Sequence, residues 1–217
     1  MIVITGASDG LGQELALLYK NRGKRVISLS RTLPSQDIDH IVTDLTNQQD
    51  IERAAALILK IDEPLQALIN CAGVMSLEPL GSISPTEVER VFKTNVLSAI
   101  QLTSLLTDRI KKDSSDIVNV ASTVGTKAYP DQAAYGASKW AMRGFSQNLQ
   151  LELKATKCRV ISFCPGGFVS DILKKATGQS LQNPSEWMDP KDLAGFMLNI
   201  LDLPKNMEVS EVVINRR

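Results

Sequence analysis

The chain has 217 residues, of which 43% are hydrophobic and 22% are charged, as is typical of one soluble globular domain. Basic and acidic residues both number 24, and this balance gives no electrostatic reason to expect binding to nucleic acid or to a membrane surface. No apolar stretch is long enough to span a bilayer. These numbers favour a single catalytic or binding domain over residues 1–217.

The first residues and the cysteines favour a cytoplasmic location. Met1–Thr5 runs straight into a strand-like segment, without the basic and apolar regions of a secretory signal. The three cysteines form no Cys-x-x-Cys pair, which suits a reducing compartment. His40 is the only histidine, so we expect no histidine-based metal site and no Ser-His-Asp triad.

Short apolar runs alternate along the chain with segments of helical periodicity. The runs expected to form strands are Ile2–Thr5, Arg25–Leu29, His40–Thr43, Leu65–Asn70, Ile117–Ala121, Arg159–Phe163 and Val209–Ile214. The segments expected to form helices are Leu11–Asn21, Gln48–Lys60, Pro85–Asp108, Gln132–Lys154 and Pro190–Leu201. This alternation predicts an α/β fold with a parallel sheet covered by helices on both faces.

Three helix starts carry capping signals. Ser84 precedes a first-turn proline and a capping-box glutamate, Glu87. Asp189 also precedes a proline, and Asp131 is expected to cap the helix that contains Tyr135. The least regular segment, residues 170–188, is expected to form a mobile substrate loop.

A glycine-rich turn, Thr5–Gly12, follows the first predicted strand and opens the first predicted helix. Gly6 permits a tight turn, Gly10 permits close approach of a pyrophosphate, and Gly12 permits close packing of helix on strand. The helix N-terminus then offers free N–H groups to phosphates. A glycine-rich turn alone is weak evidence, but at the first strand–helix junction of an alternating chain it favours a dinucleotide site.

The end of the second predicted strand favours NADP(H) over NAD(H). An acidic residue usually stands there when NAD is preferred, but this chain has Ser30-Arg31. A guanidinium can pair with a 2′-phosphate and stack on adenine. Arg31 could instead be an ordinary solvated charge, and Asp9 in the glycine turn weighs against a bound 2′-phosphate. Asp44 is placed either to accept a hydrogen bond from the adenine amine or to cap the helix that follows.

Ser122, Tyr135 and Lys139 form a candidate proton-transfer site. Tyr135 and Lys139 are four residues apart, which places them on one helical face. A free tyrosine is a poor base near neutrality, and a neighbouring ammonium lowers its pKa. Such a tyrosine can exchange a proton with a carbonyl or alcohol oxygen that Ser122 holds. Alone, the spacing also fits an ordinary surface pair.

Together these motifs resemble the short-chain dehydrogenase/reductase family of the single-domain type, over essentially the whole chain. The marks of the resemblance are Thr5–Gly12, Asp44, Asn70–Gly73, Asn95, Ser122, Tyr135, Lys139 and Pro165-Gly166. The resemblance implies a doubly wound, Rossmann-like sheet of seven strands in the order 3-2-1-4-5-6-7. It also implies a homodimer or homotetramer that associates through the helices Pro85–Asp108 and Gln132–Lys154.

The resemblance also implies a role for each matching residue. Asn95 would hold a water that links Lys139 to solvent, and Lys139 would bind the nicotinamide ribose. Cys71 and Ser170 replace the asparagine and threonine usual in the family. The residues expected to contact the cofactor are Gly6, Ser8, Asp9, Gly10, Leu11, Gly12, Ser30, Arg31, Asp44, Leu45, Asn70, Ala72, Gly73, Tyr135, Lys139, Pro165, Gly166, Val169 and Ser170.

The predicted function is hydride transfer between NADP(H) and a small carbonyl or alcohol substrate. Candidate substrate-wall residues are mostly apolar and favour an apolar ketone or aldehyde: Phe168, Leu173, Leu181, Trp187, Met188, Met75, Val124, Tyr129 and Pro130. Enoyl reductases of the family separate Tyr and Lys by six residues, whereas three intervene here. The alternative is a non-catalytic NADP(H)-binding regulator of the same fold, but such a protein would not need the complete set of Asn95, Ser122, Tyr135 and Lys139.

Overall fold

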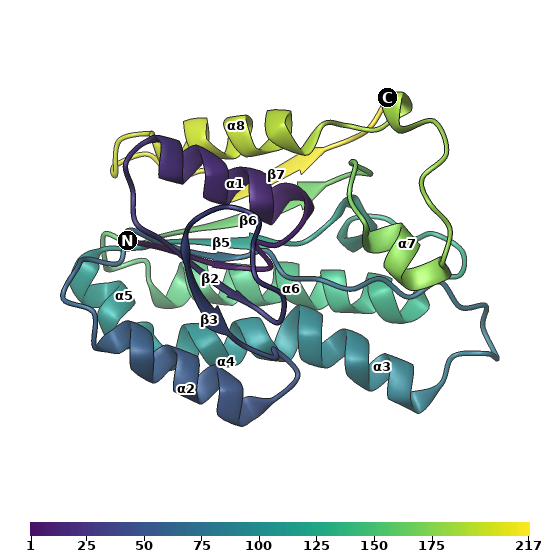
Figure 1. The fold of residues 1–217 in the computed structure, drawn as a ribbon, viewed down its shortest axis with the longest axis horizontal. Coiled ribbons are helices and arrows are strands. Elements are labelled where there is room, and N and C mark those ends of the chain that lie inside the picture. The colour runs from purple at the N-terminus through teal and green to yellow at the C-terminus, as the bar shows by residue number, and fades with distance from the viewer.

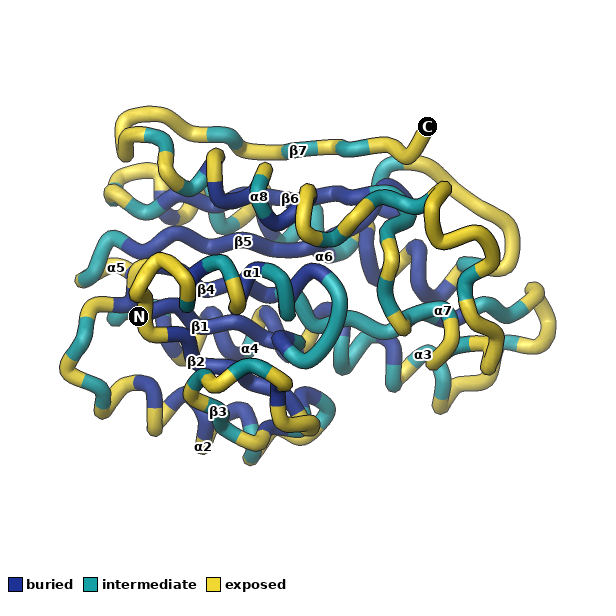
Figure 2. Tube along the Cα trace, turned by 45° about the horizontal axis from the view of Figure 1, so that its top comes forward, coloured by how far each residue is buried: buried dark blue, intermediate teal, exposed yellow.

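The computed structural model describes residues 1–217 and contains one seven-stranded sheet, in which every neighbouring pair of strands is parallel. The strand order is β3-β2-β1-β4-β5-β6-β7, which confirms the predicted order and α/β class (Figure 2). The strands are β1 (Ile2–Thr5), β2 (Val26–Ser30), β3 (Asp39–Val42), β4 (Ala67–Asn70), β5 (Asp116–Val120), β6 (Arg159–Pro165) and β7 (Glu211–Ile214).

Helices cover both faces of the sheet (Figure 1). On one face lie α1 (Gly10–Asn21) and α8 (Pro190–Leu201), and on the other lie α2 (Gln48–Leu59), α4 (Ser98–Leu105) and α6 (Ala133–Glu152). Each face has its own apolar core: Ile4 and Phe163 pack toward α1 and α8, and Val3 and Leu68 pack toward the opposite helices. Because both faces of the central strands are buried, these strands read as continuous apolar runs.

The prediction of one continuous helix over residues 85–108 is wrong. The chain instead forms α3 (Pro85–Phe92), a π-helical turn (Lys93–Leu97), α4, and then α5 (Thr107–Asp113). Asn95 lies inside the π turn and bonds both backbone groups of Val74, in the loop after β4. A wide turn of this kind is common at functional sites because it reorients side chains without ending the helix.

Two of the three predicted caps are present. The Ser84 hydroxyl accepts a hydrogen bond from the Glu87 N–H at 3.1 Å, and the Asp189 carboxylate accepts one from the Lys191 N–H at 2.8 Å. The expectation for Asp131 is wrong. Its backbone is left-handed, with φ of 57°, and the N-cap position of α6 is occupied by Gln132. The Asp131 carbonyl instead accepts a hydrogen bond from the Glu78 N–H, which fixes the preceding loop.

The carboxyl edge of the sheet positions the candidate site. The Thr5 hydroxyl, at the end of β1, accepts hydrogen bonds from the N–H groups of Cys71 and Ala72, both at 3.0 Å. This ties the glycine turn to the chain that follows β4. Ligands of doubly wound sheets bind at this edge, where the strand order reverses between β1 and β4. The short helix α7 (Ile172–Thr177) lies over the same edge (Figure 1). None of the helices combines the length and apolar composition that a bilayer crossing requires.

Candidate active site

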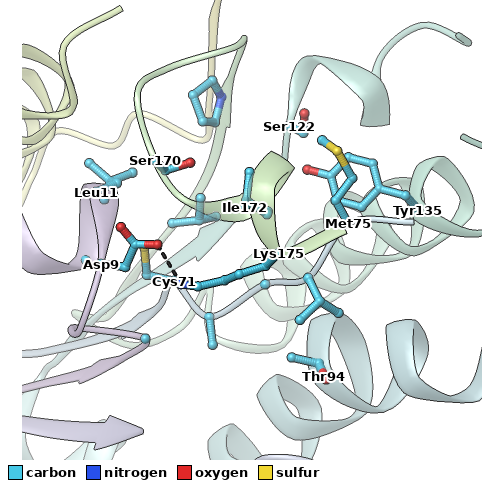
Figure 3. A pocket seen from close by; sticks show the side chains of 18 of the residues that line it. Asp9, Leu11, Cys71, Met75, Thr94, Ser122, Tyr135, Ser170, Ile172 and Lys175 are labelled. Atoms are coloured by element: carbon cyan, nitrogen blue, oxygen red, sulfur yellow. Dashed lines mark hydrogen bonds and ion pairs between the residues drawn. The ribbon is translucent and has the colours of Figure 1, made fainter. Parts of the chain in front are cut away.

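A cavity of about 580 Å³ opens at the carboxyl edge of the sheet, between the glycine turn, the ends of β4, β5 and β6, and α7. Figure 3 shows Asp9 and Cys71 at one end of it and Ser122, Tyr135 and Met75 at the other. The sequence-predicted residues that line it are Gly6, Ser8, Asp9, Gly10, Leu11, Gly12, Ser30, Arg31, Asp44, Leu45, Ala72, Gly73, Ser122, Tyr135, Lys139, Pro165, Gly166 and Ser170.

The glycine turn has a shape that only glycine permits. Gly6 and Gly10 have φ of 73° and 52°, in the left-handed region that residues with side chains adopt only rarely. A Cβ on Gly12 would lie 2.3 Å from the Gly6 carbonyl oxygen, so no side chain fits there. The turn therefore leads directly into α1, and the N-terminal N–H groups of that helix lie beside the cavity.

The cavity also contains a polar atom that lacks a partner. The Ser170 hydroxyl lies in the cavity wall opposite Gly10, is buried, and has no hydrogen-bond partner within the protein. A buried hydroxyl without a partner is costly, and a bound polar ligand would satisfy it. The open glycine turn, the helix N-terminus and this hydroxyl fit a dinucleotide. No group of three His, Cys, Asp or Glu side chains is placed to hold a metal ion.

The end of the cavity beside β2 carries the residues expected at the adenosine. Arg31 is exposed at the cavity wall and forms no ion pair with any carboxylate. The Ser30 hydroxyl is occupied, since it donates to the Thr32 carbonyl at 2.8 Å. Asp44 lines the cavity while its Oδ1 accepts hydrogen bonds from both the N–H and the hydroxyl of Thr46, so this carboxylate also organises the turn before α2.

The opposite end brings together Ser122, Tyr135 and Lys139, and all three side chains are buried. Ser122 follows β5 and caps a 3-10 turn (Thr123–Gly125) by accepting a hydrogen bond from the Val124 N–H at 3.2 Å. Tyr135 and Lys139 lie on α6, and the Lys139 ammonium lies 5.8 Å from the centre of the Tyr135 ring. Lys139 Nζ also donates to the Val120 carbonyl at 2.9 Å.

The pKa values at this end differ from the sequence expectation. Burial raises the pKa of Tyr135 to about 12, and its interaction with Ser122 opposes that rise. Burial likewise lowers the pKa of Lys139 to about 8. The structure therefore does not show the expected lowering of the Tyr135 pKa by Lys139, because burial raises that pKa and the Lys139 ammonium is directed to the Val120 carbonyl. In this state Tyr135 is a neutral phenol at neutral pH.

Three predicted site residues lie outside the cavity wall. Asn95 sits behind it and donates to the Ser138 hydroxyl on α6 at 3.0 Å, so it joins the π turn to the helix that carries Tyr135. Asn70 is buried and donates to Asn119 on β5 at 2.8 Å, so its side-chain amide is engaged within the protein, and its contact with a cofactor stays a prediction. Val169 lines a second, smaller pocket together with Gly10 and Ser170, and its contact with a cofactor also stays a prediction.

The outer part of the cavity is more basic than the sequence suggested. Phe168, Leu173, Leu181, Trp187, Met75, Val124 and Tyr129 line it as expected, whereas Met188 and Pro130 do not. Arg90, Lys127, Asn215 and Arg216 also line it and were not predicted. The pairing of β7 with β6 brings Arg216 beside Gly166. Residues that follow a parallel strand lie at this edge of the sheet. The position of Arg216 just after β7 is therefore the signal that could have identified it.

The loop over the cavity is joined to the glycine turn by an ion pair. The Lys175 ammonium on α7 lies 2.7 Å from the Asp9 carboxylate. Figure 3 marks this contact with a dashed line. The same carboxylate accepts a hydrogen bond from the Asp171 N–H at 3.2 Å. The segment 170–188, predicted to be a substrate loop, thus lies across the cavity mouth and contributes Ser170, α7 and Trp187 to its wall.

Comparison with known proteins agrees with this architecture. Residues 1–180 match the sequence model of the short chain dehydrogenase family. The oxidoreductase YbbO of Escherichia coli is 30% identical over 195 residues, which cover 84% of this chain and 72% of that protein. A solved 4-hydroxyisoleucine dehydrogenase, complexed with NADH and succinate, is 25% identical and covers 100% of this chain and 98% of its own, with a TM-score of 0.87.

A serine dehydrogenase complexed with NADP+ has the same fold, with a TM-score of 0.87 at 23% identity over 99% of this chain and 94% of its own. Solved structures of this fold thus bind either nicotinamide cofactor, and the cavity above has the features that such a cofactor requires. The match over most of its length shows that the chain belongs to the short-chain dehydrogenase/reductase family of oxidoreductases.

Proposed function

We propose that the protein is an NADP(H)-dependent oxidoreductase that interconverts a carbonyl group and an alcohol. The observation that carries this proposal is the placement of Ser122, Tyr135 and Lys139, all buried, in one wall of the cavity that begins at the glycine turn. A surface Tyr-Lys pair would be solvated and would have no cavity beside it. A bound nicotinamide supplies or accepts the hydride, so the chain itself needs to supply binding, orientation and a proton.

Ser122 and Tyr135 would hold the reacting oxygen between them. Ser122 is the second residue after the end of β5, and its hydroxyl accepts from the Val124 N–H, which leaves its own proton free to bond a substrate oxygen. Tyr135, with a pKa raised by burial to about 12, stays protonated at neutral pH. A protonated phenol can donate the proton that a carbonyl oxygen takes up when it is reduced.

Lys139 would restore the proton to Tyr135 and bind the ribose. Its pKa of about 8 lies close to neutrality, so the ammonium can lose and regain a proton at modest cost. Asn95 is a positioning residue in this scheme, because it bonds Val74 and Ser138 rather than the cavity itself. These contacts hold α6 against the π turn and thereby fix the direction of the Lys139 side chain.

NADP(H) is favoured over NAD(H) by Arg31. Its guanidinium is exposed at the adenosine end of the cavity without a carboxylate partner. The end of β2 also lacks the acidic residue that usually accompanies a preference for NAD. Asp9, which could repel a phosphate, is instead neutralised by Lys175. The relatives bind either cofactor, so the preference for NADP(H) rests on this local charge alone.

The Tyr135→Phe variant tests catalysis against the rival proposal of a non-catalytic NADP(H)-binding regulator. Loss of the phenolic proton should reduce kcat by about 100-fold or more while NADPH still binds with nearly unchanged affinity. NADPH oxidation across a panel of ketones and aldehydes measures turnover, and NADPH fluorescence measures binding. Tyr19→Phe, which alters a core tyrosine outside the cavity, is the matched control. Equal turnover in the Tyr135→Phe variant would remove Tyr135 from the mechanism and favour the regulator.

A further inference from the structure

Two cations at the outer end of the cavity have no carboxylate partner. Lys127 follows the 3-10 turn that begins after Ser122, and Arg216 follows β7. Both side chains are exposed and line the same cavity as Ser122 and Tyr135. Neither forms an ion pair within 4.0 Å, although the chain contains 24 acidic residues.

Neutral groups hold these two cations in place. Lys127 Nζ donates to the Asn215 side-chain oxygen at 3.5 Å, and the Arg216 guanidinium lies 4.4 Å from the centre of the Trp187 ring. Trp187 is itself fixed over Gly167, where an added Cβ would lie 2.4 Å from the ring. A guanidinium stacked on an aromatic ring keeps its N–H donors free at the edge. Arg216 is therefore oriented without its charge being neutralised.

The charges around the rest of the cavity do not offset these two. Asp9 and Asp44 are the only acids in the wall; Asp9 is engaged by Lys175, and Asp44 lies at the adenosine end. The remaining cation of the outer part, Arg90, is paired with Glu87. The outer end consequently carries unneutralised positive charge, which attracts an anionic group of a ligand. This differs from the apolar ketone that the sequence favoured.

We infer that the substrate is an oxo acid or hydroxy acid, whose carboxylate is bound by Lys127 and Arg216 while its carbonyl or hydroxyl group lies at Ser122 and Tyr135. This inference rests on the proposed function and adds the substrate class. An arginine presents a planar pair of N–H donors that matches a carboxylate, and a lysine adds a point charge beside it. Lys127 and Arg216 are specificity-determining residues, since they lie away from the hydroxyls that handle the proton.

Paired substrates test the role of the carboxylate charge with the ketone kept the same. Acetoacetate and levulinate are each compared with their methyl esters, which keep the ketone but lose the carboxylate. With NADPH, wild-type protein should show a kcat/KM at least roughly tenfold higher for an acid than for its ester. Lys127→Met and Arg216→Met should each lower the value for the acid roughly tenfold and leave the ester nearly unchanged. Arg217→Met is the matched control, because Arg217 lies next to Arg216 but outside the cavity wall.

Trp187 provides a readout that does not need turnover. In a Trp140→Phe background Trp187 is the only tryptophan, since the chain has two, so excitation selective for tryptophan reports on Trp187 alone. Levulinate added to the NADP+ complex should change the Trp187 emission with saturation, methyl levulinate should not, and Arg216→Met should abolish the change.

Two outcomes separate this inference from the proposed function. Reduction of esters and neutral ketones at least as fast as of acids, without carboxylate-dependent emission, would overturn the inference and leave the oxidoreductase proposal standing. Absence of all NADPH oxidation, combined with a saturable emission change for levulinate, would support carboxylate binding and reject the catalytic proposal.

Discussion

At the residue scale, Arg31 is the side chain on which the choice of cofactor depends. It is exposed at the adenosine end of the cavity and has no carboxylate partner, so its guanidinium is free to pair with a 2′-phosphate. Arg31→Ala should weaken NADPH binding by about tenfold and leave NADH binding nearly unchanged. Fluorescence titration with each cofactor measures both affinities. Arg22→Ala, an exposed arginine outside the cavity, is the control. Equal weakening of NADPH and NADH would contradict a 2′-phosphate contact.

Lys139 gives a prediction about stability and pH. Its pKa falls from the usual 10.5 to about 8 in the folded protein, so above pH 8 folding releases a proton from this side chain. The unfolded state binds more protons in that range, and the contribution of Lys139 to stability therefore rises with pH. Relative to Lys139→Met, wild-type protein should gain on the order of 2 kcal/mol of unfolding free energy between about pH 7 and about pH 10.

Urea unfolding of the two proteins at both pH values measures this gain. Lys154→Met, a substitution of an exposed lysine just after α6, should show no such difference from wild type. The free energy of unfolding of wild-type protein, measured relative to Lys139→Met, could also stay the same between the two pH values. That result would mean that Lys139 keeps an ordinary pKa in the folded protein.

The residues that could be predicted from sequence are those whose partners lie nearby in the chain or at a strand end. Tyr135 and Lys139 are one helical turn apart, and Ser122 lies two residues after the end of β5, so local rules place them. Lys127 and Asn215 are 88 positions apart and meet only because β7 pairs with β6. The direction of the Tyr135 pKa shift could not be predicted from the sequence either, because it depends on burial of the side chain and not on the spacing to Lys139.

At the scale of single elements, α7 is held to the glycine turn by one exposed ion pair, between Lys175 and Asp9. An exposed pair of this kind contributes up to about 1 kcal/mol, which corresponds to roughly a fivefold change in an opening equilibrium. Lys175→Ala should therefore increase chymotrypsin cleavage within residues 170–188 by about two- to fivefold in the absence of cofactor. Gel electrophoresis over a digestion time course measures the rate.

The neighbouring Lys174→Ala is the matched control for this cleavage assay, because Lys174 forms no ion pair and lies outside the main cavity. Cleavage of Lys175→Ala at the wild-type rate would show that the ion pair does not hold the segment. Saturating NADPH should protect both variants equally if the cofactor takes over as the anchor of this loop.

The elements also show which local signals other contacts override. Apolar periodicity predicted one helix over 85–108, but the pattern cannot reveal that Asn95 bonds Val74 and thereby widens one turn. Asp131 has the residue type of an N-cap, yet its carbonyl is committed to Glu78 and its backbone is left-handed. In both cases a contact with the loop after β4 determines the local conformation. The sequence of the helix alone does not show that this contact forms.

At the scale of the whole molecule, the strand order and layers followed from the alternation of strands and helices together with the family motifs. Association cannot be deduced in this way, because it depends on which apolar side chains the folded chain leaves exposed. Such side chains occur on the outer faces of the two regions named for association: Leu97, Ile100 and Leu105 around α4, and Trp140 and Leu151 on α6. Burial of this surface would stabilise an assembly by about 25 cal/mol per Å² of apolar area removed from water.

We therefore expect the protein to form a homodimer or homotetramer through this face, and a charge placed in it to prevent assembly. Leu97 and Trp140 are 51% and 50% exposed, so Leu97→Glu combined with Trp140→Glu should fold normally. In a symmetric interface each substitution occurs once in each subunit, so the two substitutions would bury four unpaired carboxylates, which makes association unfavourable. Light scattering should give a multiple of 23.7 kDa for wild-type protein and a single chain mass for the variant. Leu80→Glu, at a site 92% exposed before α3, should retain the wild-type mass, and a monomeric wild type would contradict the assignment.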